Sequence, residues 1–264
     1  MDIGLSSACF YPLETEKSLV RAGEAGARTV ELFMNAHSEF EKRAVDEFIS
    51  IKEHYGIDIP SVHTMASFTE SYYLFSSYKR RFVESRETTF KRNFELMNSL
   101  GAKILVLHGS KIPGSISDEE YFERFGLLSE DGKKEGITVC QENVVHYRSE
   151  SPDFLLNMAN YLGGNFNMVF DVKQSIRAGF EPLEFAEGLG KYIRHIHISD
   201  HSEARDCIVP FTGNFDFEAF FRLMLKMGYR GKYIIELYEN GYESDLQLTE
   251  ALKGLQNMLT SLQK

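Results

Sequence analysis

The chain has 264 residues, of which 43% are hydrophobic, and this is enough for one large core. Its formal net charge of −10 argues against a general nucleic-acid binder, because such a protein needs basic surface to displace phosphate counterions. No apolar run reaches the ~20 residues that cross a bilayer, and the first residues lack the pattern of a leader. The three cysteines are far apart and form neither a zinc motif nor a disulfide framework. We therefore expect a cytoplasmic protein without nucleic-acid or membrane partners, and the sequence leaves open whether it forms a homo-oligomer.

Short apolar or β-branched runs recur along the chain and predict eight β-strands. They span Ile3–Ser6, Thr29–Leu32, Ile59–His63, Lys103–His108, Thr138–Glu142, Met168–Asp171, Ile193–His197 and Tyr233–Leu237. A glycine precedes each run after the first, as expected where a helix ends, because glycine adopts the left-handed angles of a helix C-cap without strain. The runs are almost continuously apolar, which is typical of strands covered on both faces.

Amphipathic stretches of helical length lie between the runs, and the longest extends over Tyr78–Leu100. Ser117 followed by Glu120 has the spacing of a capping box, and Ser151 with Pro152 predicts an N-cap and a first helical residue. Eight strands that alternate with helices predict an α/β fold, specifically a (β/α)₈ TIM barrel, which typically has ~250 residues. No linker or low-complexity tract divides the sequence, so we expect a single domain over residues 1–264.

Each of the last four predicted strands has, at its last or second-to-last position, a side chain that can bind a metal ion. These residues are Glu142, Asp171, His197 and Glu236, at intervals of 29, 26 and 39 residues. The active site of a (β/α)₈ barrel lies at the mouth formed by the C-terminal ends of the strands, so the four side chains should meet there. Three carboxylates and one imidazole suit Mn²⁺, tolerate Co²⁺ or Mg²⁺, and can hold Zn²⁺. The sequence therefore predicts a metal site.

Polar residues also occupy other predicted strands. His63 and His108 close two of them and can contact substrate, bind a second metal ion or hydrogen-bond within the barrel. Glu31, in the second strand, either reaches the mouth or forms a local salt bridge. His195 lies two residues before His197, so both should point into the barrel, with His195 one layer deeper in the core or behind the site.

At these residues the chain resembles the xylose isomerase-like TIM barrel superfamily, specifically the sugar phosphate isomerase/epimerase group that includes ketose 3-epimerases. The resemblance spans essentially the whole chain. Its most specific segments are residues 141–143, 170–172, 195–200, 211–216 and 235–237. The resemblance implies one divalent metal ion held by Glu142, Asp171, His197 and Glu236, with a small carbohydrate as substrate. It also implies that Glu142 and Glu236 exchange protons with that substrate.

This chemistry is physically reasonable in its own right. A metal ion bound to a carbonyl group and its neighbouring hydroxyl acidifies the C–H bond between them, because it stabilises an enediolate. Two carboxylates on opposite faces can then remove a proton from one side and return one on the other. We therefore expect a metal-dependent sugar isomerase or epimerase, with Mn²⁺ as the first choice of ion and Zn²⁺, Co²⁺ or Mg²⁺ as alternatives.

The chain departs from the ketose epimerases at two positions. They have a histidine three residues after the strand-six aspartate, where this chain has Gln174, preceded by Lys173. They have an arginine six residues after the strand-seven histidine, where this chain has Glu203, and the nearest arginine is Arg205. These changes concern sugar specificity more than metal binding. We expect Lys173 and Arg205 to bind substrate together with His63 and His108.

Three alternative functions fit parts of the pattern. One is an inosose-type dehydratase, and another is a barrel that binds a ligand without turnover. The third is an endonuclease IV-like phosphodiesterase with three zinc ions, which uses histidines at the positions of His63 and His108. That activity also needs the histidine that Gln174 replaces, and an Asp-x-His motif that is absent from Ala204–Ile208. The sequence leaves open whether Gly213-Asn214 forms a phosphate-binding loop or a simple turn.

Overall fold

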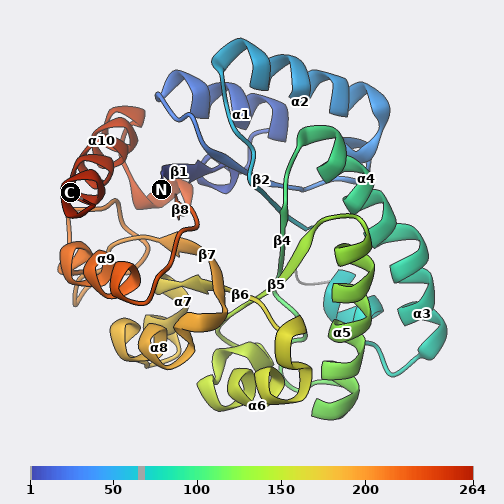
Figure 1. The fold of residues 1–264 in the computed structure, drawn as a ribbon. Helices are drawn as coiled ribbons and strands as arrows, with labels where there is room; N and C mark the ends of the chain where they lie inside the picture. Colours follow the sequence, from blue (N-terminus) through green and yellow to red (C-terminus); the bar gives the residue numbers. More distant parts are fainter. Residues whose placement is uncertain (1, 65–68, 264) are drawn as a thin grey trace.

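In the computed structural model, which describes residues 2–64 and 69–263, eight parallel strands form a closed barrel (Figure 1). Each strand pairs with the next in sequence, and β8 pairs with β1 to close the ring. The strands are β1 (Ile3–Ser6), β2 (Val30–Phe33), β3 (Ser61–His63), β4 (Ile104–Leu107), β5 (Thr138–Glu142), β6 (Met168–Asp171), β7 (Ile193–Ile198) and β8 (Tyr233–Ile235). The predicted (β/α)₈ barrel is confirmed.

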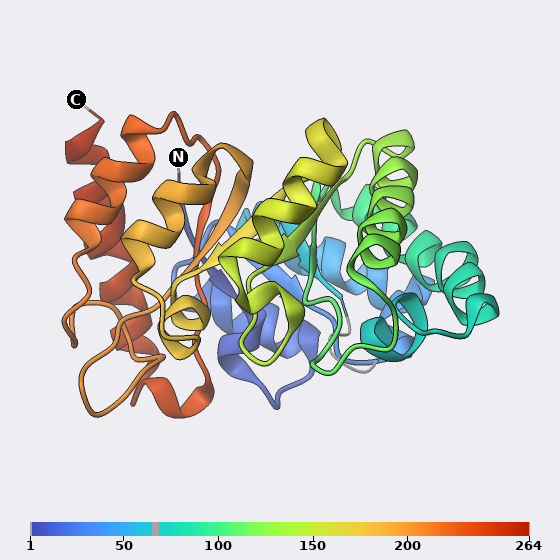
Figure 2. The same ribbon diagram turned by 90° about the horizontal axis from the view of Figure 1, so that it is seen from below.

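The α-helices surround the strands, and the loops that follow the strands gather along the lower edge of the side view in Figure 2. The helices are α1 (Thr15–Glu24), α2 (Lys42–Tyr55), α3 (Lys79–Glu84), α4 (Lys91–Leu100), α5 (Asp118–Lys134), α6 (Pro152–Leu162), α7 (Val172–Arg177), α8 (Pro182–Leu189), α9 (Phe217–Lys226) and α10 (Asp245–Leu262). Within the described residues, no helix combines the length and apolar character needed to cross a membrane.

Every predicted strand is present; Ile3–Ser6, Thr138–Glu142 and Met168–Asp171 have the predicted ends, and no other end is displaced by more than two residues. Two of the predicted strand-end residues lie just outside their strands, because β4 ends at Leu107 before His108, and β8 ends at Ile235 before Glu236. The backbone N–H of Glu236 still donates to Ile198 O of β7, at 3.1 Å. Hydrogen bonding between β7 and β8 therefore continues far enough to fix the backbone position from which the Glu236 side chain extends.

The interior of the barrel changes character from one end to the other. Val106, Cys140 and Val169 pack together inside the barrel and are fully buried. The residues two positions further along these segments are His108, Glu142 and Asp171. Since alternate residues of a strand point to the same side, the apolar layer lies directly beneath polar side chains at the C-terminal end. The barrel thus supports its mouth on a packed apolar layer along β4, β5 and β6.

The stretch Tyr78–Leu100 is helical as predicted but is not one regular α-helix. The π-helical segment Ser85–Phe90 joins α3 to α4. Near this junction the Ser85 hydroxyl donates to Phe82 O at 2.8 Å, and the Thr88 hydroxyl donates to Glu84 O at 2.5 Å. Hydroxyl groups that bond to backbone carbonyls compete with regular helical hydrogen bonds, and π segments are local insertions in such helices. Periodicity alone does not reveal this change of pitch.

The two predicted helix starts are confirmed. The Ser117 hydroxyl accepts from the backbone N–H of Glu120 at 3.2 Å and caps α5. Ser151 caps α6 in the same manner, with Pro152 as its first residue. Side-chain caps of this kind satisfy backbone N–H groups that have no partner within the helix.

We predict that Ser117→Ala lowers the free energy of unfolding by about 1 kcal/mol, the usual loss for a helix N-cap. Ser117→Asp is the matched control, because its carboxylate can accept the same hydrogen bond. Urea unfolding followed by circular dichroism measures both variants. If the alanine and aspartate variants were equally stable, the cap would contribute nothing to the fold.

Candidate metal centre

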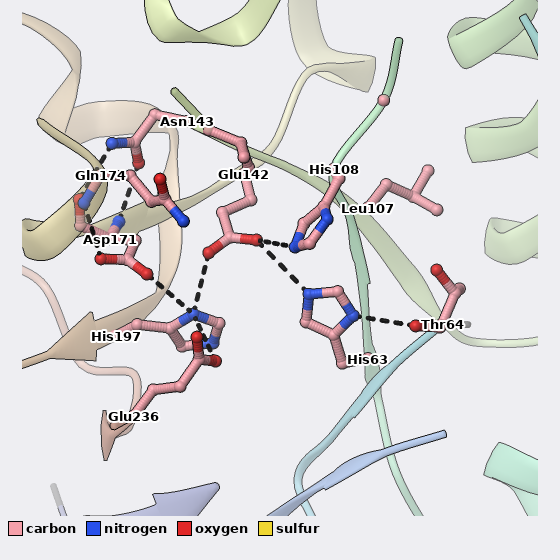
Figure 3. Close-up of polar contacts among 12 residues, drawn as sticks. His63, Thr64, Leu107, His108, Glu142, Asn143, Asp171, Gln174, His197 and Glu236 are labelled. Carbon is pink, nitrogen blue, oxygen red and sulfur yellow. Dashed lines mark hydrogen bonds and ion pairs between the residues drawn. The ribbon is translucent and has the colours of Figure 1, made fainter. Parts of the chain in front are cut away.

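Glu142, Asp171, His197 and Glu236 meet at the C-terminal mouth of the barrel, as predicted from their strand ends (Figure 3). One potential ligand atom from each residue lies within 4.8 Å of those of the others. The first three side chains are buried, and that of Glu236 is 12% exposed. Four strands that end at the same rim therefore bring together residues almost a hundred positions apart in the sequence.

The imidazole of His197 lies at the centre of this cluster. Its Nδ1 atom is 3.1 Å from Glu142 Oε1, 3.3 Å from Glu236 Oε2 and 3.8 Å from Asp171 Oδ2. Its Nε2 atom faces the opposite way and lies 3.0 Å from Glu31 Oε1. Burial alone would lower the pKa of His197, but Glu31 and Glu236 raise it well above its ordinary value. The Nδ1 side of the ring therefore faces three carboxylates.

The chemistry of this donor set fits a divalent cation. Asp171 Oδ2 and Glu236 Oε2 are buried and form no aligned hydrogen bond among the described residues, although Lys173 Nζ lies 3.1 Å from the first and His197 Nδ1 lies 3.3 Å from the second. Buried oxygens left in this state are costly, and a bound cation would satisfy both. Carboxylate oxygens with one imidazole nitrogen form a set that Mn²⁺, Mg²⁺ or Zn²⁺ can accept. The four residues can therefore hold the predicted ion.

Lys173 lies against two of these carboxylates. Its Nζ atom is 2.8 Å from Glu236 Oε1 and 3.1 Å from Asp171 Oδ2, and its side chain is 1% exposed. Burial would lower the pKa of Lys173, but Asp171 and Glu236 raise it well above its usual range. The ammonium group therefore neutralises part of the cluster's charge. Its predicted contact with substrate stays a prediction.

His63 and His108 lie on the other side of Glu142. Glu142 Oε2 is 3.1 Å from His108 Nε2 and 3.4 Å from His63 Nε2, while His63 Nδ1 is 3.0 Å from Thr64 O. A carbonyl oxygen only accepts, so His63 Nδ1 carries a hydrogen, and Nε2 can face the carboxylate only as a second N–H or across a cation. Burial lowers the pKa of His63, but Glu142 raises it to about 9. Together with Glu142, the two histidines form a second group able to hold a metal ion.

The two glutamates expected to move protons are both held as anions. Burial would raise the pKa of Glu142, but His108, His197 and His63 hold it well below its ordinary value. Burial would likewise raise the pKa of Glu236, but Lys173 and His197 lower it. Neither pKa moves towards neutrality, so both groups are ready to accept a proton. Returning that proton must then depend on geometry rather than on a matched pKa.

Residues 19–258 match the family model for the xylose isomerase-like TIM barrel. The chain belongs to this family. An uncharacterized protein of Mycobacterium leprae is 21% identical over an alignment of 280 positions, which covers 95% of each chain. An uncharacterized protein of Methanocaldococcus jannaschii is 27% identical over 174 residues, covering 61% of this chain and 62% of that protein.

Solved structures of similar fold include several described as sugar epimerases. A D-tagatose 3-epimerase-like protein has a TM-score of 0.81 at 20% identity, with full coverage of both chains. An L-ribulose 3-epimerase has a TM-score of 0.79 at 15% identity and covers 100% of this chain and 96% of its own. A xylose isomerase-like TIM barrel protein of Mycobacterium smegmatis, in complex with magnesium, has a TM-score of 0.74 at 17% identity, with coverage of 94% and 89%. At these identities the likeness establishes the fold.

Asn143 positions Asp171, one of the four candidate ligands, a role that the sequence did not reveal. Its Oδ1 atom accepts from the backbone N–H of Asp171 at 2.8 Å, and its Nδ2 atom donates to Asp171 O at 2.9 Å. The amide thus pairs with the backbone of Asp171 as a further strand residue would. The sequence signals were that Asn143 directly follows Glu142, where β5 ends, and that it lies in residues 141–143, one of the segments that carry the family resemblance.

The side chains of Arg205 and Gln174 form contacts outside the four-residue cluster. Arg205 is exposed and donates to Asn240 O at 2.7 Å, and none of its described hydrogen bonds involves the four-residue cluster. It lines a polar cavity of about 500 Å³ together with Arg177 and Tyr238. Gln174, which replaces the family's histidine, accepts from the backbone N–H of Val145 through Oε1 at 3.2 Å. Its side chain thus ties α7 to the loop after β5.

Glu31 reaches the inner side of the cluster, which settles one of the alternatives left by the sequence. It contacts both His195 and His197, and all three side chains are buried. His195 lies one layer below His197, as predicted, and its Nε2 atom is 3.0 Å from Glu31 Oε2. Glu31 therefore fulfils both alternatives, because the salt bridge that it forms with His197 also brings it to the mouth of the barrel.

We predict that Asn143→Ala destabilises the protein by about 1–3 kcal/mol, because it leaves the buried backbone groups of Asp171 without partners. It should also weaken Mn²⁺ binding, since Asp171 loses its support. Asn93→Ala is the control, because Asn93 is equally buried but bonds to Thr89 O within the helical layer. Urea unfolding and Mn²⁺ titration separate the two effects. Unchanged Mn²⁺ affinity in Asn143→Ala would show that Asp171 does not need this support.

Proposed function

We propose that this chain is a divalent-metal-dependent sugar isomerase or epimerase that moves a proton next to a carbonyl group. The observation that carries the proposal is the placement of two ionised glutamates around one point. Glu142 Oε1 and Glu236 Oε2 lie 3.1 and 3.3 Å from the same atom, His197 Nδ1. A substrate held beside His197 Nδ1 would therefore lie between two carboxylate bases. The sugar 3-epimerases of similar fold support this reaction class.

The ion would supply a Lewis acid that polarises the carbonyl group and stabilises the enediolate. Of the chain's own residues, one of Glu142 and Glu236 removes the proton, and the other returns a proton on the opposite face. Lys173 holds Glu236 in place through the 2.8 Å contact to Oε1, leaving Oε2 directed towards the cluster. We assign His108, whose side chain is 16% exposed, to a substrate oxygen. His63 is 1% exposed and is better placed to support Glu142.

We propose Mn²⁺ as the resident ion, with Mg²⁺, Co²⁺ and Zn²⁺ as alternatives. The three carboxylates and one imidazole favour a hard cation. The magnesium complex of the Mycobacterium smegmatis protein supports a divalent ion in a barrel of this type. Nothing in the donor set requires a thiolate ligand.

We propose that the loop after β7 does not bind a phosphate group of the sugar substrate. In many barrels the loops after strands 7 and 8 bind phosphate through backbone amides. Here the N–H groups of Gly213 and Phe215 donate to the Asp200 carboxylate, each at 2.9 Å, and that of Asn214 donates to His201 O at 2.7 Å. A side chain of the protein thus already occupies the position that an anion would take, which supports a turn at Gly213-Asn214.

One observation favours a second candidate, a phosphodiesterase of the endonuclease IV type. His63, His108 and Glu142 can hold a further ion beside the first. Against it stand Gln174, whose side chain bonds to the backbone of Val145, and the acidic net charge of −10. The number and identity of bound ions distinguish the two candidates.

We predict one divalent ion per chain after purification without chelator, because the four-residue cluster forms one complete site. Elemental analysis gives the identity and number of ions. Asp171→Asn should lower the occupancy, since an amide oxygen is a weaker ligand than a carboxylate. Two ions per chain would mean that His63 and His108 are also ligands, and three zinc ions would favour the nuclease. Absence of metal, with no thermal shift on adding Mn²⁺, Co²⁺ or Zn²⁺, would contradict the proposal.

We predict that Glu142→Gln and Glu236→Gln each reduce turnover by about 10²–10⁴-fold, the usual effect of removing an acid–base group. Gln keeps the shape and one coordinating oxygen, so the loss of Mn²⁺ binding should be much smaller. Glu239→Gln, an exposed position on the same loop as Glu236, is the control. The assay is an NMR screen of ketoses, ketose phosphates and inososes in D₂O with added Mn²⁺.

Incorporation of deuterium next to the carbonyl identifies proton transfer, and loss of water from an inosose identifies a dehydratase. A single variant that still exchanges deuterium but forms no epimer would show that the two glutamates serve opposite faces. If both variants turn over at nearly the wild-type rate with metal bound, the two-carboxylate mechanism is wrong. His63, His108 and Lys173 are then the bases to test, in that order.

A further inference from the structure

A small polar group lies inside the barrel, directly beneath the metal cluster. It consists of Glu31 on β2, Ser61 on β3 and His195 on β7, and each is 0% exposed. The neighbouring inward positions on β4, β5 and β6 are the apolar residues Val106, Cys140 and Val169. Burying a carboxylate in such a place is costly unless each oxygen has a partner. The partners of Glu31 therefore indicate why it is there.

Each carboxylate oxygen of Glu31 faces a different histidine. Glu31 Oε2 lies 3.0 Å from His195 Nε2, which is also 3.1 Å from the Ser61 hydroxyl. Glu31 Oε1 lies 3.0 Å from His197 Nε2. This last contact has the distance of an ion pair but is not an aligned hydrogen bond, and neither atom has an aligned hydrogen-bond partner among the described residues. Glu31 is thus anchored on one side by His195 and directed at His197 on the other.

The direction of these contacts decides where the hydrogens of His197 lie. An ionised carboxylate only accepts, so a short contact with Glu31 Oε1 requires the hydrogen on His197 Nε2. A neutral imidazole then has its lone pair on Nδ1, the atom that faces Glu142, Asp171 and Glu236. A metal-binding histidine generally donates its other N–H to a carboxylate or carbonyl, which fixes the tautomer and the ring orientation.

We propose that Glu31 is a positioning residue for the metal site: it holds His197 as the Nε2–H tautomer, while His195 holds Glu31. This inference rests on the metal-dependent function proposed above. It gives the fully buried Glu31 a role in metal affinity, although Glu31 is not itself a ligand. A structural role alone would instead stabilise the barrel without changing how well the site binds a cation.

Glu31→Gln tests this with little change of shape. If the Gln amide nitrogen faces His197, the imidazole must move its hydrogen to Nδ1, where it blocks the metal. If the amide oxygen faces His197, the contact remains but loses its negative charge. Either arrangement should weaken Mn²⁺ binding by about 10–100-fold, the usual cost of removing such a partner. Ser61→Ala is the matched control, because Ser61 contacts His195 and should change Mn²⁺ affinity by less than about threefold.

The measurement is the dissociation constant of Mn²⁺ for metal-stripped protein, with the thermal midpoint of the metal-free protein recorded separately. Weaker Mn²⁺ binding in Glu31→Gln, beyond any change in Ser61→Ala, supports the inference. Equal Mn²⁺ binding by wild type and Glu31→Gln overturns it and leaves the proposed function intact. Failure of the wild type to bind Mn²⁺, Co²⁺ or Zn²⁺ would instead overturn the proposed function.

A second measurement needs no variant and remains decisive if Glu31→Gln does not fold. In wild-type protein labelled with ¹⁵N-histidine and loaded with diamagnetic Zn²⁺, long-range ¹H–¹⁵N spectra report which ring nitrogen of His197 carries hydrogen. The inference requires hydrogen on Nε2 and the metal on Nδ1. Hydrogen on Nδ1, or metal on Nε2, would overturn it.

Discussion

The imidazole ring of His197 lies among four carboxylates at the mouth of this barrel, three of them buried and that of Glu236 12% exposed. His197 contacts Glu31 through Nε2, and Glu142, Asp171 and Glu236 through Nδ1, over distances of 3.0–3.8 Å. Like charges this close raise each other's free energy strongly in a medium of low dielectric constant. Positive charge must therefore enter the same small volume, and the raised pKa of His197 is one expression of this requirement. A bound divalent cation would be another.

Positive charge is distributed unevenly around the two candidate acid–base residues. Glu236 has the ammonium group of Lys173 at 2.8 Å, a charge that persists throughout the neutral pH range because the pKa of Lys173 is raised. His197 contacts both glutamates, but Glu142 has two further imidazoles, those of His63 and His108, in place of an ammonium group, and an imidazole is charged only when it is protonated. The two carboxylates therefore differ in electrostatic environment although both are glutamates. In the proposed reaction, they would not be interchangeable as proton donor and acceptor.

The sequence was sufficient to predict the parts of the site that depend on strand position. A residue that closes a parallel strand reaches the mouth whatever the loops do, so Glu142, Asp171 and His197 could be located from the apolar runs alone. Residues beyond the strand ends could not be located in this way. Lys173 contacts Asp171 and Glu236 because α7 begins directly after β6, whereas Arg205 donates to a loop carbonyl, and neither path is encoded in a local pattern.

The same limit applies to backbone groups. Gly213-Asn214 ahead of a helix is compatible with both an anion site and a turn, and the choice depends on Asp200, more than ten residues away in the sequence. The π-helical segment in Tyr78–Leu100 likewise depends on hydroxyl contacts rather than on hydrophobic periodicity. Predictions based on period and spacing therefore succeed where geometry is repetitive. They fail where one side chain replaces a backbone or ligand contact.

The chemical difference between carboxylate and imidazole ligands accounts for the mixed layer beneath the site. A carboxylate presents its oxygens at its tip and needs nothing polar behind it, so β5 and β6 place Cys140 and Val169 below Glu142 and Asp171. An imidazole has two nitrogens on opposite sides of the ring, and a ligand nitrogen at the front leaves an N–H at the back that must be accepted. Glu31 lies at that position, below His197. If His197 is the one nitrogen ligand, as we propose, the polar group inside the barrel is a consequence of using a histidine there, and a site built from carboxylates alone could rest on an apolar core.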